Sequence, residues 1–198
     1  MARSYTLKRR AEQQAQTRQR IVEAAVDLHG TIGPAHTSLS MVAERAGVQR
    51  NTLYAHFPDE RSLAMACSGL FVERNPPPDA DDWRGINDEA ERLRAGLTAI
   101  YGWYAQTEQL TGCVLRDAEH HELTREISQI RLGPAVMAWH EVLGEGLSRE
   151  QQALVHLALS FHTWRALVRE AGLSDAAAVE LMVGAILLPL REKVSAAG

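Results

Sequence analysis

Five polar side chains with the chemistry of nucleic-acid recognition stand close together in the stretch QRNTLYAHFPDE. If this stretch is helical, Arg50, Asn51 and Tyr54 share one face, and Thr52 and His56 lie on its two flanks. Guanidinium, amide, hydroxyl and aromatic groups are those that contact base edges and phosphates in DNA. The pattern therefore indicates a short helix that presents a DNA-binding face.

Such a short helix must be held by the rest of the protein, because isolated helices of this length are marginal in water. Leu53 and Phe57, four residues apart, predict an apolar side that packs inward. A preceding helix, capped by Thr37 or Ser38, is predicted to carry the apolar stripe Leu39, Val42, Ala43 and Ala46. Gly47 permits the left-handed turn between the two helices. The arrangement is typical of a helix-turn-helix.

The longer stretch TSLSMVAERAGVQRNTLYAHFPDERSL resembles the DNA-binding head of the TetR/AcrR family of transcriptional regulators. The resemblance covers roughly residues 15–65 and implies a homodimer that binds a double-stranded DNA operator and releases it when a small molecule enters its helical body. It further implies phosphate contacts from Thr37 and Ser38, groove contacts from Arg50, Asn51 and Thr52, and contacts to phosphate or bases from Tyr54 and His56.

Three positions depart from the family pattern. Glu60 stands where the family usually has a phosphate-binding Lys, and the neighbouring Arg61 is a candidate replacement. Gln49 occupies a position often held by a small capping Ser, and His29 occupies one often held by a core Phe.

Charge is divided unevenly along the chain, whose net charge is −4. Residues 1–65 carry nine Lys or Arg against six Asp or Glu, whereas residues 66–198 carry twelve against nineteen. A basic head on an acidic body is consistent with DNA binding by the head. Lys8, Arg9 and Arg10 are equally compatible with a solvated tail and with an arm that contacts DNA.

Helical periodicity runs through the whole chain, and strand signals are almost absent, so the sequence predicts an all-α fold. We expect a head of three helices with a helix-turn-helix, followed by a larger helical body for effector binding and dimerisation, with domains over residues 1–58 and 59–198. The helices are predicted over about 12–28, 37–46, 48–57, 59–73, from Trp83 through Tyr104, 122–143 (interrupted or bent at Gly133–Pro134), 148–168 and 176–190.

The body contains candidates for an effector site between the helices that begin near Trp83 and Glu122. A small, largely apolar ligand is expected, because a ligand site combines apolar walls with a few convergent polar groups. For the aromatic members, packing in an ordinary apolar core is the more usual role. The candidates are Tyr101, Trp103, Tyr104, Arg116, Trp139, His140 and His162.

The last helix is apolar almost all round, which indicates that it is covered on more than one side. We predict that a second copy of the chain provides part of this cover. The residues assigned to that interface are Phe161, Trp164, Leu181, Met182, Val183, Ile186, Leu187 and Leu190.

Several function classes find no support in the sequence. HHELT at 120–124 is not the HExxH zinc motif, and there is no Gly-rich phosphate loop or GxSxG elbow. No enzyme activity, metal or other cofactor is therefore expected. The basic N-terminus lacks a signal-peptide core and no apolar run is long enough for a bilayer, so we expect a cytoplasmic protein. The main alternative is a DNA-binding architectural protein without an effector, and a more distant one is a small all-α enzyme with an incidental helix-turn-helix.

Overall fold

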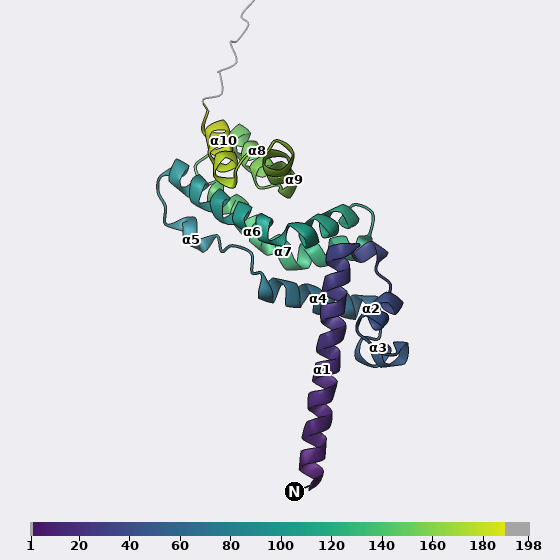
Figure 1. Cartoon of the computed structure of the whole chain (residues 1–198). Coiled ribbons are helices and arrows are strands. Elements are labelled where there is room, and N and C mark those ends of the chain that lie inside the picture. The colour runs from purple at the N-terminus through teal and green to yellow at the C-terminus, as the bar shows by residue number, and fades with distance from the viewer. Residues whose placement is uncertain (1, 189–198) are drawn as a thin grey trace, which may run out of the picture. The chain divides into compact units, whose positions relative to one another are not determined.

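The computed structural model (Figure 1) describes residues 2–188, with side chains from residue 8, and contains helices and no strand over that range. The predicted all-α fold is confirmed. The α-helices are α1 (Ala2–Thr31), α2 (Leu39–Arg45), α3 (Arg50–His56), α4 (Glu60–Arg74), α5 (Asp81–Arg84), α6 (Glu89–Ala118), α7 (Glu122–Leu143), α8 (Arg149–Ala158), α9 (Phe161–Arg165) and α10 (Asp175–Leu187). A short 3₁₀ helix covers Pro34–His36 and a short π-helix covers Ala166–Glu170.

The helices form two compact units that each combine segments distant in sequence. Unit 1 comprises Met1–Pro77 with Thr107–Pro134, and unit 2 comprises Pro78–Gln106 with Ala135–Gly198. The long helices α6 and α7 thus supply residues to both units. This division by contacts differs from the predicted boundary after residue 58, because parts of α6 and α7 pack with the head helices. The functional division of the chain stays a prediction.

The core of unit 1 holds the short helix α3. Leu53 and Phe57 are 0% and 1% exposed, so the two predicted anchors are buried. They join a cluster that includes Ile21 of α1, Val42 of α2 and Leu63 of α4. The Arg18 guanidinium lies 4.7 Å from the centre of the Phe57 ring and covers one edge of this cluster.

Local hydrogen bonds set the limits of the head helices. Ser38 is the N-cap of α2, since its Oγ accepts from the Met41 N–H at 3.3 Å. Gly47 has φ 64°, the left-handed conformation predicted for the turn. Asp59 caps α4 through a reciprocal capping box with Ser62. These bonds satisfy N–H groups that a helix end leaves open.

Several predicted helix limits were wrong. The first helix begins at Ala2 rather than near residue 12, because its Ala-, Arg- and Gln-rich start favours helix without an apolar stripe. Trp83 belongs to the separate helix α5, and α6 begins at Glu89 after Asp88 accepts the Glu91 N–H. Helix α7 is continuous through Pro134. The helix predicted over 148–168 ends at Ala158, because Ser160 caps a new helix.

Within unit 1, side chains at the end of α6 form hydrogen bonds with the loop between α1 and α2. The buried Asp117 carboxylate accepts the Ala35 N–H at 2.9 Å and the Arg116 Nε–H at 2.8 Å. Arg116 Nη2 donates to the Ile32 carbonyl at 2.9 Å. Gly33 lies between these groups with φ 97°. The start of the helix-turn-helix is therefore tied directly to α6.

Unit 2 is built around aromatic side chains and contains all four tryptophans of the chain. Tyr101 and Tyr104 on α6 donate their hydroxyl protons to the carbonyls of Ala158 and Leu159, at 3.0 and 2.7 Å. The Trp164 indole N–H donates to Asp175 at 2.8 Å. Each buried ring thus also satisfies its polar atom, as buried Tyr and Trp require.

Gly33→Ala should destabilise the protein by at least about 2 kcal/mol, because this backbone region is essentially restricted to glycine. An added Cβ would also lie 2.3 Å from both Arg116 Nη2 and Asp117 Oδ2. Gly102→Ala is the control: its Cβ meets no atom within 4 Å and its helical position should gain about 0.5–1 kcal/mol. Denaturant unfolding measures both. Equal stability of the Gly33 variant and wild type would contradict the proposed role of this loop.

Candidate functional site

The exposed face of α3 presents the polar groups that the sequence placed there. Arg50, Asn51 and Tyr54 are exposed, whereas Thr52 and His56 are half-buried on its flanks. Arg50 Nη2 donates to the Tyr54 hydroxyl at 3.4 Å, and its guanidinium lies 5.9 Å from the Tyr54 ring centre. The structure brings these two side chains together on a helix whose opposite side is fixed by the core. Their role in DNA contact stays a prediction.

The other predicted DNA contacts lie in the same unit. Ser38 is exposed at the start of α2 and holds its cap, while Thr37 donates its hydroxyl proton to the Gly33 carbonyl at 2.7 Å. Lys8, Arg9 and Arg10 are exposed on the part of α1 that extends past α2 and α3 (Figure 1). These three basic residues stand on a helix, and their contact with DNA stays a prediction.

Two departures from the family pattern have structural consequences. Gln49 is the N-cap of α3 but its side chain makes no cap hydrogen bond. Arg61 forms a bidentate ion pair with Glu126 of α7, with Nη2 to Oε1 at 2.7 Å, and this bond lowers the pKa of the Glu126 carboxyl. In this conformation, the Arg61 guanidinium is bound to Glu126 of α7, and its role as a phosphate contact in place of the family Lys stays a prediction.

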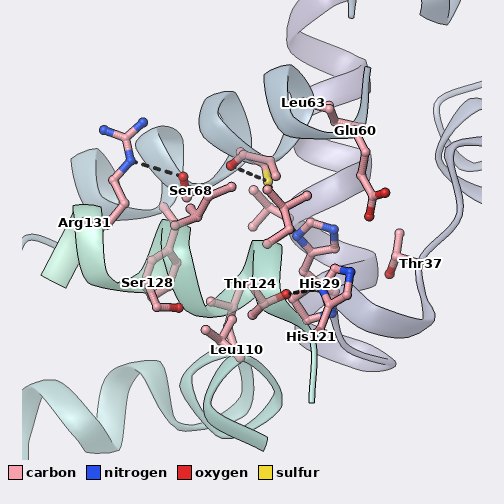
Figure 2. Close-up of a pocket in the computed structure, with 18 of the residues that line it drawn as sticks. His29, Thr37, Glu60, Leu63, Ser68, Leu110, His121, Thr124, Ser128 and Arg131 are labelled. Carbon is pink, nitrogen blue, oxygen red and sulfur yellow. Dashed lines mark hydrogen bonds between the residues drawn. The ribbon is translucent and has the colours of Figure 1, made fainter. Parts of the chain in front are cut away.

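Unit 1 also contains a largely apolar cavity of about 110 Å³ between helices α1, α2, α4, α6 and α7 (Figure 2). Arg131 and Ser68 lie at one end of the cavity, and His29, Thr37 and His121 lie at the other. The walls between them are mostly aliphatic. They include Val26, Leu39, Val42, Leu63, Ala64, Phe71, Leu110, Val114, Leu115, Ile127 and Leu132.

Two of the groups at the His29 end of this cavity are neutral. His29 Nδ1 lies 3.5 Å from Cys67 Sγ, and burial lowers the His29 pKa to about 4. Burial likewise raises the Cys67 pKa to about 12, so that the thiol stays protonated. His121 Nδ1 is 2.7 Å from the Thr124 hydroxyl. His29 and Cys67 therefore offer hydrogen bonds without charge.

The opposite end carries the Arg131 guanidinium, which is half-buried. Its Nε donates to the Ser68 hydroxyl at 3.1 Å, and its Nη2 donates to the Met65 carbonyl at 2.6 Å. Both partners are neutral groups on α4. The arrangement holds a positive charge beside an apolar space.

None of the seven predicted effector residues lines this cavity. Tyr101, Trp103, Tyr104 and Trp139 are buried in the packed aromatic core of unit 2, where their rings fill space instead of enclosing it. Arg116 of unit 1 is bonded to Asp117 and Ile32. His140 lines a polar pocket of unit 2 and stacks on His156, and His162 is exposed. Their effector role stays a prediction.

A single chain already covers most of the predicted dimer residues, whose role in dimerisation stays a prediction. Phe161, Trp164, Met182, Val183 and Ile186 are at most 6% exposed within unit 2. The aromatic rings of α6 and the packing of α8 on α10 provide the cover that we expected from a partner.

Of the predicted dimer residues that the structure describes, Leu181 and Leu187 keep exposed surface that a partner can contact. Leu181 is 51% exposed, Leu187 is half-buried, and Leu190 lies outside the described residues. The exposed residues of α10 therefore differ from those that the all-round apolar pattern of the sequence suggested.

The head matches the family model described as bacterial regulatory proteins, tetR family, over residues 21–67, which span the end of α1, the helix-turn-helix and the first half of α4. This chain belongs to the tetR family. It is 34% identical to the class C tetracycline repressor protein of Escherichia coli over 87 residues, 41% of this chain and 40% of that protein. The family and these relatives are regulatory proteins rather than enzymes.

A longer match joins the chain to an uncharacterized HTH-type transcriptional regulator of Mycobacterium tuberculosis, with 33% identity over 138 residues. That alignment covers 68% of this chain and 64% of the relative. The chain thus spans less than two thirds of the length of each of these relatives.

Solved structures share the fold over most of the chain. The FadR regulator from Bacillus subtilis, solved with stearoyl-CoA, gives a TM-score of 0.60 at 18% identity, covering 87% of this chain and 98% of that one. NalD, the secondary repressor of the MexAB-OprM multidrug efflux pump in Pseudomonas aeruginosa, gives 0.61 at 22% identity, covering 88% and 95%. At these identities the similarity concerns the fold.

No helix within residues 2–188 is both long and apolar enough to cross a membrane. In the same part of the chain, no three His, Cys, Asp or Glu side chains come together as metal ligands.

The residues that line the cavity were missed at the sequence level, although one signal was present. His29 departs from the core Phe of the family pattern. It lines the cavity, with its Nδ1 3.5 Å from Cys67 Sγ. The cavity joins residues 26–72 to residues 110–132, and no local pattern indicates that these segments meet.

His29 should make the stability of the protein depend on pH. Because burial lowers its folded pKa to about 4 from 6.5, the unfolded chain binds more protons between these values. The contribution of neutral His29 to the free energy of unfolding should be fully present above pH 6.5. It should be lost as the pH drops towards 4, which lowers the stability by up to about 3 kcal/mol.

The His29→Phe variant should lose less stability than wild type between pH 7 and pH 4, because this range spans both the unfolded and the folded pKa of His29. His120→Gln, which changes an exposed histidine, is the control. Urea unfolding at several pH values gives the comparison. An identical pH dependence in wild type and the His29 variant would show that His29 is not held neutral by burial.

Proposed function

We propose that this tetR-family protein is a DNA-binding transcriptional regulator, acting as a homodimeric repressor that a small ligand releases from its operator. The observation that carries the proposal is the exposed polar face of α3 on a helix-turn-helix whose other side is buried through Leu53 and Phe57. A buried anchor fixes the helix, so its polar face can enter a groove as a rigid element.

Arg50 and Tyr54 are the residues with the clearest means of reading DNA. An exposed guanidinium can donate two hydrogen bonds to the O6 and N7 atoms of guanine in the major groove. In the free protein, the Arg50 guanidinium is oriented by the Tyr54 hydroxyl and ring. Asn51 and Thr52 reach neighbouring DNA bases. Ser38 and the basic side chains of α1 contact phosphates and fix the register of the protein on the DNA.

Homodimerisation is supported by an exposed small and apolar face of α10. Ala177, Leu181 and Gly184 follow one another at intervals of four and three, and all are exposed, as is Leu188 directly after the end of α10. A Cβ added at Gly184 would meet no atom within 4 Å, so another helix can approach closely there. A two-fold axis through this face would present two recognition helices to half-sites about 34–36 Å apart.

Release by a ligand requires that the ligand prefer a conformation with the wrong spacing of the two heads. The names of two similar proteins support such a switch. One is a tetracycline repressor, and the other is a regulator whose structure was solved with stearoyl-CoA. In this chain, Asp117 and Arg116 connect α6 to the loop at Gly33, so a shift of α6 would move the helix-turn-helix. A coupling of about 1–3 kcal/mol is the usual scale.

Arg50→Ala and Tyr54→Ala should each weaken specific operator binding by about 1–3 kcal/mol, through the loss of a base contact. The operator can be selected from DNA that flanks the coding sequence, and gel-shift titration at fixed salt gives the affinity. Arg149→Ala, which removes an exposed arginine from unit 2, should leave the affinity unchanged. Wild-type affinity in both α3 variants would rule out α3 as the recognition helix.

Leu181→Glu should convert the dimer to a monomer at micromolar concentration, because it places a charge on the proposed apolar interface. Leu181 is half exposed, so the variant should fold, whereas the buried Val183 would test folding instead. Met137→Glu changes a residue of α7 that is 73% exposed and should stay dimeric. Sedimentation velocity distinguishes these states. A monomeric wild type, or a dimeric Leu181 variant, would exclude this interface.

A further inference from the structure

We propose that the unit 1 cavity binds a small monocarboxylic acid, with its apolar body among the aliphatic side chains and its carboxylate on Arg131. The inference rests on the proposed function in naming the effector class of this regulator. The binding step itself involves no DNA and is measured without it.

The size and lining of the cavity define the body of the ligand. Its volume is about 110 Å³ and its walls are predominantly aliphatic. For comparison, an engineered apolar cavity of about 150 Å³ in another protein admits benzene. The cavity is therefore suited to a short alkyl chain or a single ring, and its apolar walls favour such a group over a polar one.

Arg131 defines the head group of the ligand. Its Nε and Nη2 donate to the neutral Ser68 hydroxyl and Met65 carbonyl, and no carboxylate within residues 8–188 forms an ion pair with it. The hydrogen bonds of Arg131 to protein groups in that range use its Nε and Nη2. A half-buried guanidinium without a counter-ion favours an anion, and carboxylates match its geometry.

The other charged residue of the cavity lining is Glu60, at the end opposite to Arg131 (Figure 2). Glu60 is exposed at the first residue of α4, whereas Arg131 is half-buried. Attraction between charges is stronger where water is partly excluded, so Arg131 is the better site for charge recognition. His29 and Cys67 are neutral and do not compete for the acid. A cationic ligand at Glu60 is the alternative that the experiment must exclude.

The position of the cavity gives ligand binding a direct route to the DNA-binding helices. Val26, Leu39, Val42 and Leu63 line the cavity and also pack against or belong to the core that holds α3. An occupant thus touches the inner surfaces of α1, α2 and α4. A ligand that fits one arrangement of these helices better than another shifts the population of head conformations.

Three probes of equal chain length test the head group: hexanoate, hexanol and hexylamine. Binding to the purified full-length protein is measured by isothermal titration calorimetry and ligand-observed NMR, without DNA. Hexanoate should bind most tightly, hexanol more weakly, and hexylamine most weakly. Preferential binding of hexylamine would favour Glu60 and overturn the proposal, as would the absence of hexanoate binding.

Arg131→Gln should weaken hexanoate binding about tenfold or more and leave hexanol binding unchanged, because it removes a charge-assisted hydrogen bond. The matched control is Arg125→Gln, an exposed arginine of the same helix that does not line the cavity. Equal hexanoate affinity in wild type and the Arg131 variant would overturn the proposal.

A second variant tests the location of the ligand body. Ser128 lines the cavity, so Ser128→Leu should fill part of the space and abolish the binding of both hexanoate and hexanol. Cooperative thermal unfolding establishes that the variant is folded. Retention of hexanoate binding by a folded Ser128 variant would place the ligand elsewhere. Operator titration with hexanoate follows separately, so a failure of DNA binding is not confused with a failure of this site.

Discussion

The burial of Leu53 and Phe57 is the constraint on which the rest of the head depends. A seven-residue helix cannot persist alone, so α3 exists because these two side chains are enclosed by α1, α2 and α4. That enclosure fixes which face of α3 points outward, and it explains why Arg50 and Tyr54 can be exposed together on a rigid support. The helix-turn-helix is therefore a property of the four-helix packing and not of α3.

The head could be predicted from the sequence because its determinants are local. The capping Ser38, the positive φ at Gly47 and the two anchors of α3 are each recognisable within a few residues, and each was found in the structure. The limits of α1 and α6 were missed for the opposite reason. Helix formers without apolar periodicity extend α1, and Asp88 rather than Trp83 begins α6.

The body and the cavity could not be predicted in the same way. An apolar residue on a helix can face its own chain or a partner, and only the tertiary fold decides which. Met182, Val183 and Ile186 are covered by their own chain, whereas Leu181 is not. Likewise, nothing local predicts that Arg131 of α7 meets Ser68 of α4, since the contact depends on how two distant helices pack.

The placement of the tryptophans in unit 2 has a spectroscopic consequence. Trp83, Trp103, Trp139 and Trp164 all belong to that unit, and all are nearly inaccessible to solvent. Intrinsic indole emission therefore reports on the environment of unit 2 alone, whereas far-ultraviolet circular dichroism reports on the helices of both units. A denaturation in which the two signals diverge would reveal that the units unfold independently, and a coincident transition would reveal that α6 and α7 make them one cooperative body.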